Sequence, residues 1–137
     1  MKISFIIPTF NEEGNVAELY NQINSAVKDL DNYEFIYMFI ENGSTDNTLK
    51  ELIKISKNNP NVKIIKLSRN FKMDGAIAAG LNSFNEDAAI IMTANLQDDP
   101  SVIPEFIKNW ELGYDQVYGV VKSRPGKSIL RKLNSVL

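Results

Sequence analysis

The residues that follow one short apolar run carry the side chains best suited to chemistry. After the apolar residues Ala88–Met92 comes the stretch Thr93–Asp98, in which hydroxyl, amide and carboxylate oxygens are close together. Oxygen ligands suit hard cations such as Mg²⁺ and Mn²⁺, which can bridge phosphate groups. A cation on a diphosphate neutralises the charge that develops as the diphosphate leaves. The stretch therefore points to phosphate chemistry.

The composition narrows the possible chemistry. The 137 residues include no cysteine and no histidine, which excludes disulfides, thiolate zinc sites and histidine-based triads. The formal net charge of −2 gives no electrostatic footprint for nucleic acid, so no nucleic-acid partner is expected. No apolar stretch approaches the roughly 20 residues of a membrane span. Carboxylates, amides, hydroxyls, Lys, Arg or an oxygen-bound metal must do the chemistry.

Two common phosphate-binding motifs are absent. No predicted strand is followed by a Gly-x-Gly-x-x-Gly loop, which makes a dinucleotide site of that type unlikely. Gly126, Lys127 and Ser128 resemble the end of a phosphate loop, but Val121 stands where that loop needs its first glycine. A nucleotide site in this chain would have to be built without these loops.

Apolar residues mark five predicted strands. Each is a short run bounded by turn residues, and between the runs the apolar spacing changes to that of helices. The runs are Ile3–Pro8, Phe35–Ile40, Val62–Leu67, Ala88–Thr93 and Tyr114–Val121. Strands that alternate with helices predict an α/β fold with a mostly parallel sheet covered on both faces.

Four predicted helices connect these strands. The first covers Glu12–Leu30 with Asn11 as its N-cap, and the second is capped within Ser44–Thr45. The third is rich in glycine and alanine, which would let it approach the sheet closely. In the fourth, Asp99 is the cap and Pro100 the first helical residue.

Polar loops follow the first four predicted strands, and each of these loops contains Asn. In parallel sheets, ligands bind outside the carboxyl ends of the strands. The loops are Pro8–Glu13, Glu41–Asp46, Ser68–Gly75 and Thr93–Asp99. Their side chains could hydrogen-bond a base or a ribose, so together they predict a nucleotide-diphosphate site.

These motifs together resemble the family 2 glycosyltransferases. The resemblance covers nearly the whole chain, in order, and is strongest to the polyprenyl-phosphate group, similar to dolichyl-phosphate mannose synthase. The stretches that carry it are Ile6–Tyr20, Asn42–Thr48, Ile65–Phe71 and Leu96–Val120. The resemblance implies a GT-A fold, whose nucleotide-binding half is a Rossmann-like, doubly wound α/β sheet.

The resemblance also implies an activity, which is inverting transfer of a sugar from a nucleotide diphosphate sugar to an acceptor. The implied acceptor is a lipid phosphate, such as a polyprenyl phosphate, or a saccharide, in the synthesis of cell-envelope polysaccharide. We expect residues 1–137 to be the donor-binding part, truncated at the C-terminus before the acceptor-binding part and any membrane-associated region. The expected location is cytoplasmic, at the cytoplasmic face of the membrane for the longer protein. The sequence is compatible with a monomer or an oligomer.

Site residues are carried over from the family pattern by position. Contacts to the nucleotide are expected from Pro8, Thr9, Phe10, Glu12, Asn42, Ser44 and Asp74. Contacts to the metal and diphosphate are expected from Asn95, Gln97 and Asp98. No residue is assigned as the catalytic base, because the family supplies that base from the acceptor side.

The metal motif departs from the family pattern. The group reads Asp-Ala-Asp-Leu-Gln-Asp, whereas here Thr93 and Asn95 replace the first two aspartates. Glu41 and Asn42 likewise stand in place of an Asp pair. An amide can coordinate Mg²⁺ or Mn²⁺, but without the charge that dominates affinity for hard cations. We therefore expect a weakened cation site that the diphosphate of the donor completes.

These departures leave alternatives open. The chain could be a catalytically silent relative that binds a nucleotide or a partner protein, or a sugar-nucleotide hydrolase. Glu12 could serve only a helix start, and Arg69 and Asn70 could lie in a solvated loop or bind a phosphate or the sugar. Arg124 could belong to a loop that closes over the donor. Ser128–Leu137 predicts either a terminal helix on the core or the start of further structure.

Overall fold

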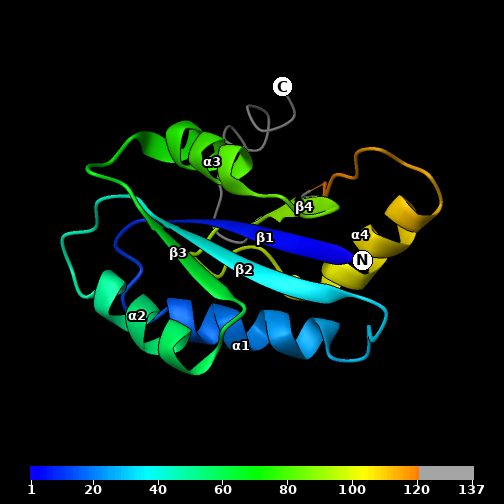
Figure 1. The fold of residues 1–137 in the computed structure, drawn as a ribbon, viewed down its shortest axis with the longest axis horizontal. Coiled ribbons are helices and arrows are strands. Elements are labelled where there is room, and N and C mark those ends of the chain that lie inside the picture. The colour runs from blue at the N-terminus through cyan, green and yellow to red at the C-terminus, as the bar shows by residue number, and fades with distance from the viewer. Residues whose placement is uncertain (121–137) are drawn as a thin grey trace, which may run out of the picture. The chain divides into compact units, whose positions relative to one another are not determined.

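A four-stranded parallel sheet forms the centre of the fold. The structure, a computed structural model, describes residues 1–120. The first of two compact units is Met1–Pro104, and the second begins at Glu105. The strands are β1 (Lys2–Thr9), β2 (Glu34–Glu41), β3 (Val62–Lys66) and β4 (Ala88–Ile91), in the order β3-β2-β1-β4 (Figure 1). The predicted α/β fold with a parallel sheet is confirmed.

Helices cover both faces of this sheet. Figure 1 shows α1 and α2 on one face and α3 on the other, which is the doubly wound arrangement. A short 3₁₀ helix, η1, follows β4 and leads directly into α4. The helices are α1 (Val16–Val27), α2 (Thr48–Asn58), α3 (Lys72–Ser83), η1 (Pro100–Val102) and α4 (Ile103–Glu111).

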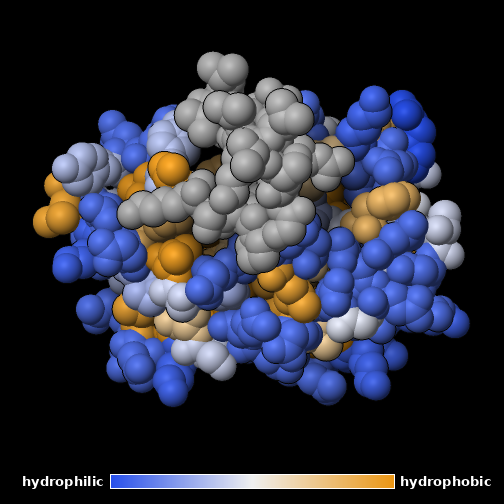
Figure 2. All heavy atoms as spheres, turned by 180° about the vertical axis from the view of Figure 1, so that it is seen from behind, coloured by the Kyte–Doolittle hydropathy of each residue, from blue (hydrophilic) through white to orange (hydrophobic). Residues whose placement is uncertain are grey.

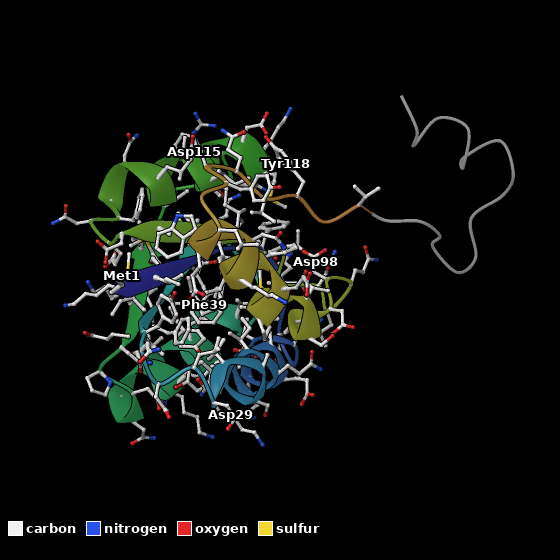
Figure 3. All side chains as sticks on the ribbon, turned by 90° about the vertical axis from the view of Figure 1, so that its right-hand side faces the viewer. Met1, Asp29, Phe39, Asp98, Asp115 and Tyr118 are labelled. Carbon is white, nitrogen blue, oxygen red and sulfur yellow. The ribbon has the colours of Figure 1, made fainter. Side chains whose placement is uncertain are left out.

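The core between the sheet and α1 is aromatic. The ring of Tyr37 lies 5.2 Å from that of Phe5 and 4.8 Å from that of Tyr20, measured between centroids. The Tyr37 hydroxyl donates a hydrogen bond to Asn24 Oδ1, and burial raises the pKa of this phenol. Phe39, two residues further along β2, is also fully buried (Figure 3). These rings fix α1 beneath the sheet.

The opposite face of the sheet packs closely against α3. Ile6, Met38 and Ile40 form a buried cluster with Ala76 of the helix. A Cβ atom at Gly80 would lie 2.5 Å from Ile6 Cγ2, so the missing side chain is what allows this approach. The expectation that small residues bring this helix close to the sheet is confirmed.

Two predicted helix starts are wrong. Helix α1 begins at Val16, with Asn15 rather than Asn11 at the N-cap, and α2 begins at Thr48. Neither Ser44 nor Thr45 caps α2, whose N-cap position is Asn47. The reason is that Asn11 and Ser44 bond to each other's loops instead of to the helices that follow them.

The predicted fifth strand does not form within the described residues. Residues 114–120 adopt no strand, and Tyr118 and Val120 are 76% and 82% exposed. A strand must exchange backbone hydrogen bonds with a neighbour, and the apolar pattern of a sequence does not supply that neighbour. Val121, Arg124 and Ser128–Leu137 lie outside the described residues.

The surface seen in Figure 2 is mostly hydrophilic, with hydrophobic side chains in small separate areas. Of the helices within residues 1–120, none is long and apolar enough to cross a membrane.

Candidate functional site

A cavity of about 290 Å³ lies at the carboxyl ends of β1, β2 and β4. Because β2 and β4 lie on opposite sides of β1, the connections leave in opposite directions there, as at the ligand-binding switch points of open α/β sheets. The residues lining the cavity are Pro8, Thr9, Phe10, Glu12, Asn42, Asn70, Lys72, Met73, Thr93, Ala94 and Asn95. This is the candidate site.

The cavity brings together most of the residues predicted to contact a nucleotide. They are Pro8, Thr9, Phe10, Glu12 and Asn42, with Asn95 from the predicted diphosphate site. Ser44 lines a neighbouring groove instead. Asp74, Gln97 and Asp98 do not line the cavity. Lys72 and Met73, the first two residues of α3, line it but were missed, although they lie within the predicted polar loop Ser68–Gly75.

Hydrogen bonds join the loop after β1 to the loop after β2. The Asn11 backbone N–H donates to Ser44 Oγ at 3.0 Å, and the Thr45 N–H donates to Asn11 Oδ1 at 2.8 Å. The Glu12 N–H donates to the buried Thr48 Oγ1 at 2.9 Å. These bonds fix the position of Glu12 at the cavity wall.

The carboxylate of Asp46 stabilises the end of the loop after β2 by hydrogen bonds. Asp46 Oδ1 accepts the Thr48 backbone N–H at 2.9 Å and also the Thr48 hydroxyl. The bond from this hydroxyl is the main reason that the pKa of Asp46 lies below its ordinary value. Thr48, the first residue of α2, thus bonds both to Glu12 in the loop after β1 and to Asp46 in the loop after β2.

Asn42 holds the loop after β3. Its Nδ2 donates to Asn70 Oδ1 at 3.2 Å and to the Lys72 carbonyl oxygen at 3.1 Å. Its Oδ1 accepts the Phe71 N–H at 2.9 Å, and the residue is 4% exposed. A contact between Asn42 and a base stays a prediction, since both polar atoms of the side chain already bind this loop.

Two positively charged side chains near the end of β3, Arg69 and Lys72, face different hollows of the surface. The Arg69 guanidinium carbon lies 4.1 Å from the ring centroid of Phe71, which is a cation–π arrangement. Arg69 lines the neighbouring groove and not the cavity. Lys72 lines the cavity and is exposed.

The loop after β4 is closed by its own hydrogen bonds. The Thr93 hydroxyl lies 2.7 Å from Asp98 Oδ2 and 2.9 Å from Asn95 Oδ1. The Thr93 N–H also donates to Asp98 Oδ2 at 3.0 Å, and the Gln97 N–H donates to Asn95 Oδ1 at 3.1 Å. Figure 3 shows Asp98 on this loop, well apart from the buried Phe39.

The oxygens of this loop do not fit a divalent cation held by the protein alone. Asn95 Oδ1 already accepts the Gln97 N–H and Asp98 Oδ2 the Thr93 N–H, and Asp98 is the single carboxylate among the predicted ligands. Residues 1–120 contain no group of three or more Asp, Glu, His or Cys side chains placed to hold a metal ion. The weak cation site expected from the sequence therefore has no support from the described ligands.

Asp99 has a structural role. Its Oδ1 accepts the Ser101 N–H at 3.0 Å at the start of η1, and this bond lowers the pKa of Asp99. Pro100 is the first residue of η1. The predicted capping by Asp99 and Pro100 is confirmed, although the first turn is 3₁₀ and not α-helical.

A residue in the left-handed region lies in the loops after β1, β2 and β4, and another is the first residue of α3. The φ angles are 49° at Asn11, 79° at Gly43, 63° at Lys72 and 60° at Leu96. This conformation is unfavourable for residues with a side chain other than Asn or Asp. Strained backbone of this kind concentrates at functional sites, where the surrounding structure holds it.

The sequence matches one family over nearly its whole length. Residues 4–136 match Glycosyl transferase family 2. An uncharacterized glycosyltransferase, sll0501, of Synechocystis sp. is 36% identical over 98% of this chain and 42% of its own length. The prophage bactoprenol glucosyl transferase homolog of Escherichia coli is 36% identical over 85% of this chain and 38% of its own. The chain thus spans about two fifths of the length of these relatives.

Solved structures share the fold. A mannosyltransferase from Pyrobaculum calidifontis in complex with GDP-Man and Mn²⁺ superposes with a TM-score of 0.66 at 17% identity, over 77% of this chain and 31% of that one. S. aureus TarS 1-349 in complex with UDP-GlcNAc superposes with a TM-score of 0.63 at 24% identity, over 80% and 32% of the two chains.

Proposed function

Because the chain belongs to glycosyl transferase family 2, we propose that it binds the nucleotide-sugar donor of an inverting glycosyl transfer. The cavity at the carboxyl ends of β1, β2 and β4 carries this proposal. Its volume is close to the range of small-molecule sites, and it collects predicted nucleotide contacts from the ends of β1 and β2 and a predicted diphosphate contact from the loop after β4. Residues 1–137 would then be the donor-binding part of a longer enzyme.

The proposed acceptor is a polyprenyl phosphate. The name of the Escherichia coli relative, a bactoprenol glucosyl transferase homolog, supports this class of acceptor. In the proposed transfer, an acceptor oxygen forms a bond to the anomeric carbon while the bond from that carbon to the diphosphate breaks. The diphosphate leaves with the electron pair, so groups near it must stabilise its negative charge.

A second candidate is a relative that binds a nucleotide but transfers no sugar. The loop after β4 favours it, because Thr93 and Asn95 carry no charge and Asp98 is bonded to Thr93. The two functions differ in whether the longer protein releases a nucleoside diphosphate from a nucleotide sugar when an acceptor is present. Release without any acceptor would instead indicate a hydrolase.

A thermal-shift screen tests donor binding directly. A ligand that binds the native state alone raises the melting temperature, by an amount that grows with its concentration relative to Kd. We expect at least one nucleoside diphosphate, and its sugar conjugate, to raise the Tm of the 137-residue chain. A screen of uridine, guanosine, adenosine and cytidine diphosphates with no shift at millimolar concentration would contradict the proposal.

A further inference from the structure

We propose that Lys72 supplies the positive charge that meets the diphosphate of the donor, so that this chain binds a nucleoside diphosphate without a divalent cation. The inference rests on the proposed function and concerns the same cavity. Three features support it, which are the charges that line the cavity, the backbone at Lys72 and the closed loop after β4.

Lys72 is the one cationic residue among those that line the cavity, and Glu12 is the one anionic residue. The Glu12 carboxylate accepts a hydrogen bond from Asn15 Nδ2 at 2.8 Å, so it is engaged within its own loop. Within residues 1–120 the Lys72 ammonium makes no hydrogen bond or ion pair. Lys72 is therefore the one positively charged side chain at the cavity wall, and its ammonium has no competing partner among these residues.

The backbone of Lys72 is held in an unfavourable conformation at the cavity wall. Its φ angle is 63°, in the left-handed region. The Lys72 N–H donates to Asn70 Oδ1 at 2.7 Å, and the Lys72 carbonyl accepts from the buried Asn42 at 3.1 Å. A lysine is thus fixed by the protein at a position whose backbone would suit glycine better, which fits a role for its side chain.

The loop after β4 leaves the charge of a diphosphate to be met by another group. The Thr93 hydroxyl and N–H both lie within hydrogen-bonding distance of Asp98 Oδ2, so the one carboxylate among the predicted metal ligands is engaged within its own loop. A lysine ammonium binds phosphate as a point charge with three donors. Lys72 can provide in this cavity the charge that the loop after β4 does not gather.

Calorimetric titration of the 137-residue chain with UDP, GDP, ADP and CDP tests this inference, in EDTA and again with Mn²⁺. For the diphosphate that binds, we expect a Kd in EDTA within about twofold of the Kd with Mn²⁺, well inside the tenfold that 1.4 kcal/mol represents. Lys72→Met should raise the Kd in EDTA about tenfold, the size expected for one charge-assisted contact. The corresponding monophosphate should lose less affinity in this variant.

Three further variants separate the charge from the backbone. Lys72→Gly relieves the left-handed strain and should weaken binding as much as Lys72→Met. Lys72→Arg keeps the positive charge and should keep the Kd close to that of the wild type. Lys54→Met removes an exposed lysine of α2 that does not line the cavity, and it should leave the Kd unchanged.

Two results would overturn the role of Lys72 while leaving the proposed function standing. One is binding that appears only with Mn²⁺. The other is an unchanged Kd in Lys72→Met. If no nucleoside diphosphate binds under either condition, the proposed function fails, and the inference about Lys72 fails with it.

Discussion

Asn42 uses both polar atoms of its side chain inside the protein. Its three hydrogen bonds reach Asn70 and Phe71, in the loop after β3, and Lys72, the first residue of α3. The sequence predicts a ligand contact at this position. In the structure, Asn42 lines the cavity and also supports Lys72, which lines it too.

We expect Asn42→Ala to lower the free energy of unfolding by about 1–3 kcal/mol, because buried partners lose their hydrogen bonds. Urea unfolding at equilibrium measures this. Asn82→Ala, at an exposed position of α3, is the matched control and should change stability by less than about 0.5 kcal/mol. Equal stability of Asn42→Ala and wild type would show that these bonds contribute nothing.

Ser4 presents the opposite case. Its hydroxyl is buried and has no hydrogen-bond partner among the described residues. A buried hydroxyl without a partner is unfavourable by about 1–3 kcal/mol, so Ser4→Ala should be neutral or stabilising. The buried hydroxyl of Thr48, in contrast, accepts the Glu12 N–H and donates to Asp46. Thr48→Val removes both bonds and should therefore destabilise the fold by about 1–3 kcal/mol. A clear loss of stability in Ser4→Ala, measured by urea unfolding, would contradict the first expectation.

Among the secondary-structure elements, α3 depends most directly on the absence of a side chain. A Cβ at Gly80 would meet Ile6 Cγ2 at 2.5 Å and Ile40 Cδ1 at 3.3 Å. The helix that begins at Lys72 is therefore positioned by its packing against β1 and β2.

Gly80→Ala should destabilise the fold, because crowding of about 1–3 kcal/mol outweighs a gain of about 1 kcal/mol in helix propensity. Thermal or urea unfolding of the variant measures the net effect. In a double-mutant cycle, Ile6→Ala should be less harmful in the Gly80→Ala background, because it removes the atom that clashes. Additive effects of the two substitutions would argue against the contact with Ile6.

The wrongly predicted helix starts have a related cause. Asn11 and Ser44 are good capping residues by type, but each bonds to the loop that follows the neighbouring strand. Those bonds depend on β1 and β2 lying side by side in register, with Thr9 opposite Glu41. Local sequence rules have no access to this pairing.

On the scale of the whole molecule, the rim of the sheet gathers polar groups from four loops without assembling a cluster of carboxylates. The described residues hold no such cluster, and the two substituted positions of the metal motif, Thr93 and Asn95, are uncharged. The wall of the cavity thus offers hydrogen-bonding groups and one positively charged side chain, that of Lys72.

We expect Mn²⁺ alone to leave the Tm of the chain unchanged at millimolar concentration, because neutral oxygens bind hard cations weakly. The double variant Thr93→Asp/Asn95→Asp restores two carboxylates, so its Tm should rise with Mn²⁺. Thermal unfolding with and without Mn²⁺ measures both. Tight binding of Mn²⁺ by the wild-type chain would contradict this expectation.

The sequence by itself determined the α/β class, the four strands of the sheet, the polar rim and the family, because these follow from apolar periodicity and from motifs in a fixed order. The tertiary structure alone decided that Asn42 binds a loop, that Thr93 bonds Asp98, and that Lys72 lines the cavity. Asn42 bonds residues about 30 positions away, and even within the loop after β4 several side chains could bond the same groups. Which pairs form depends on strand order and register, which no local pattern of residues contains.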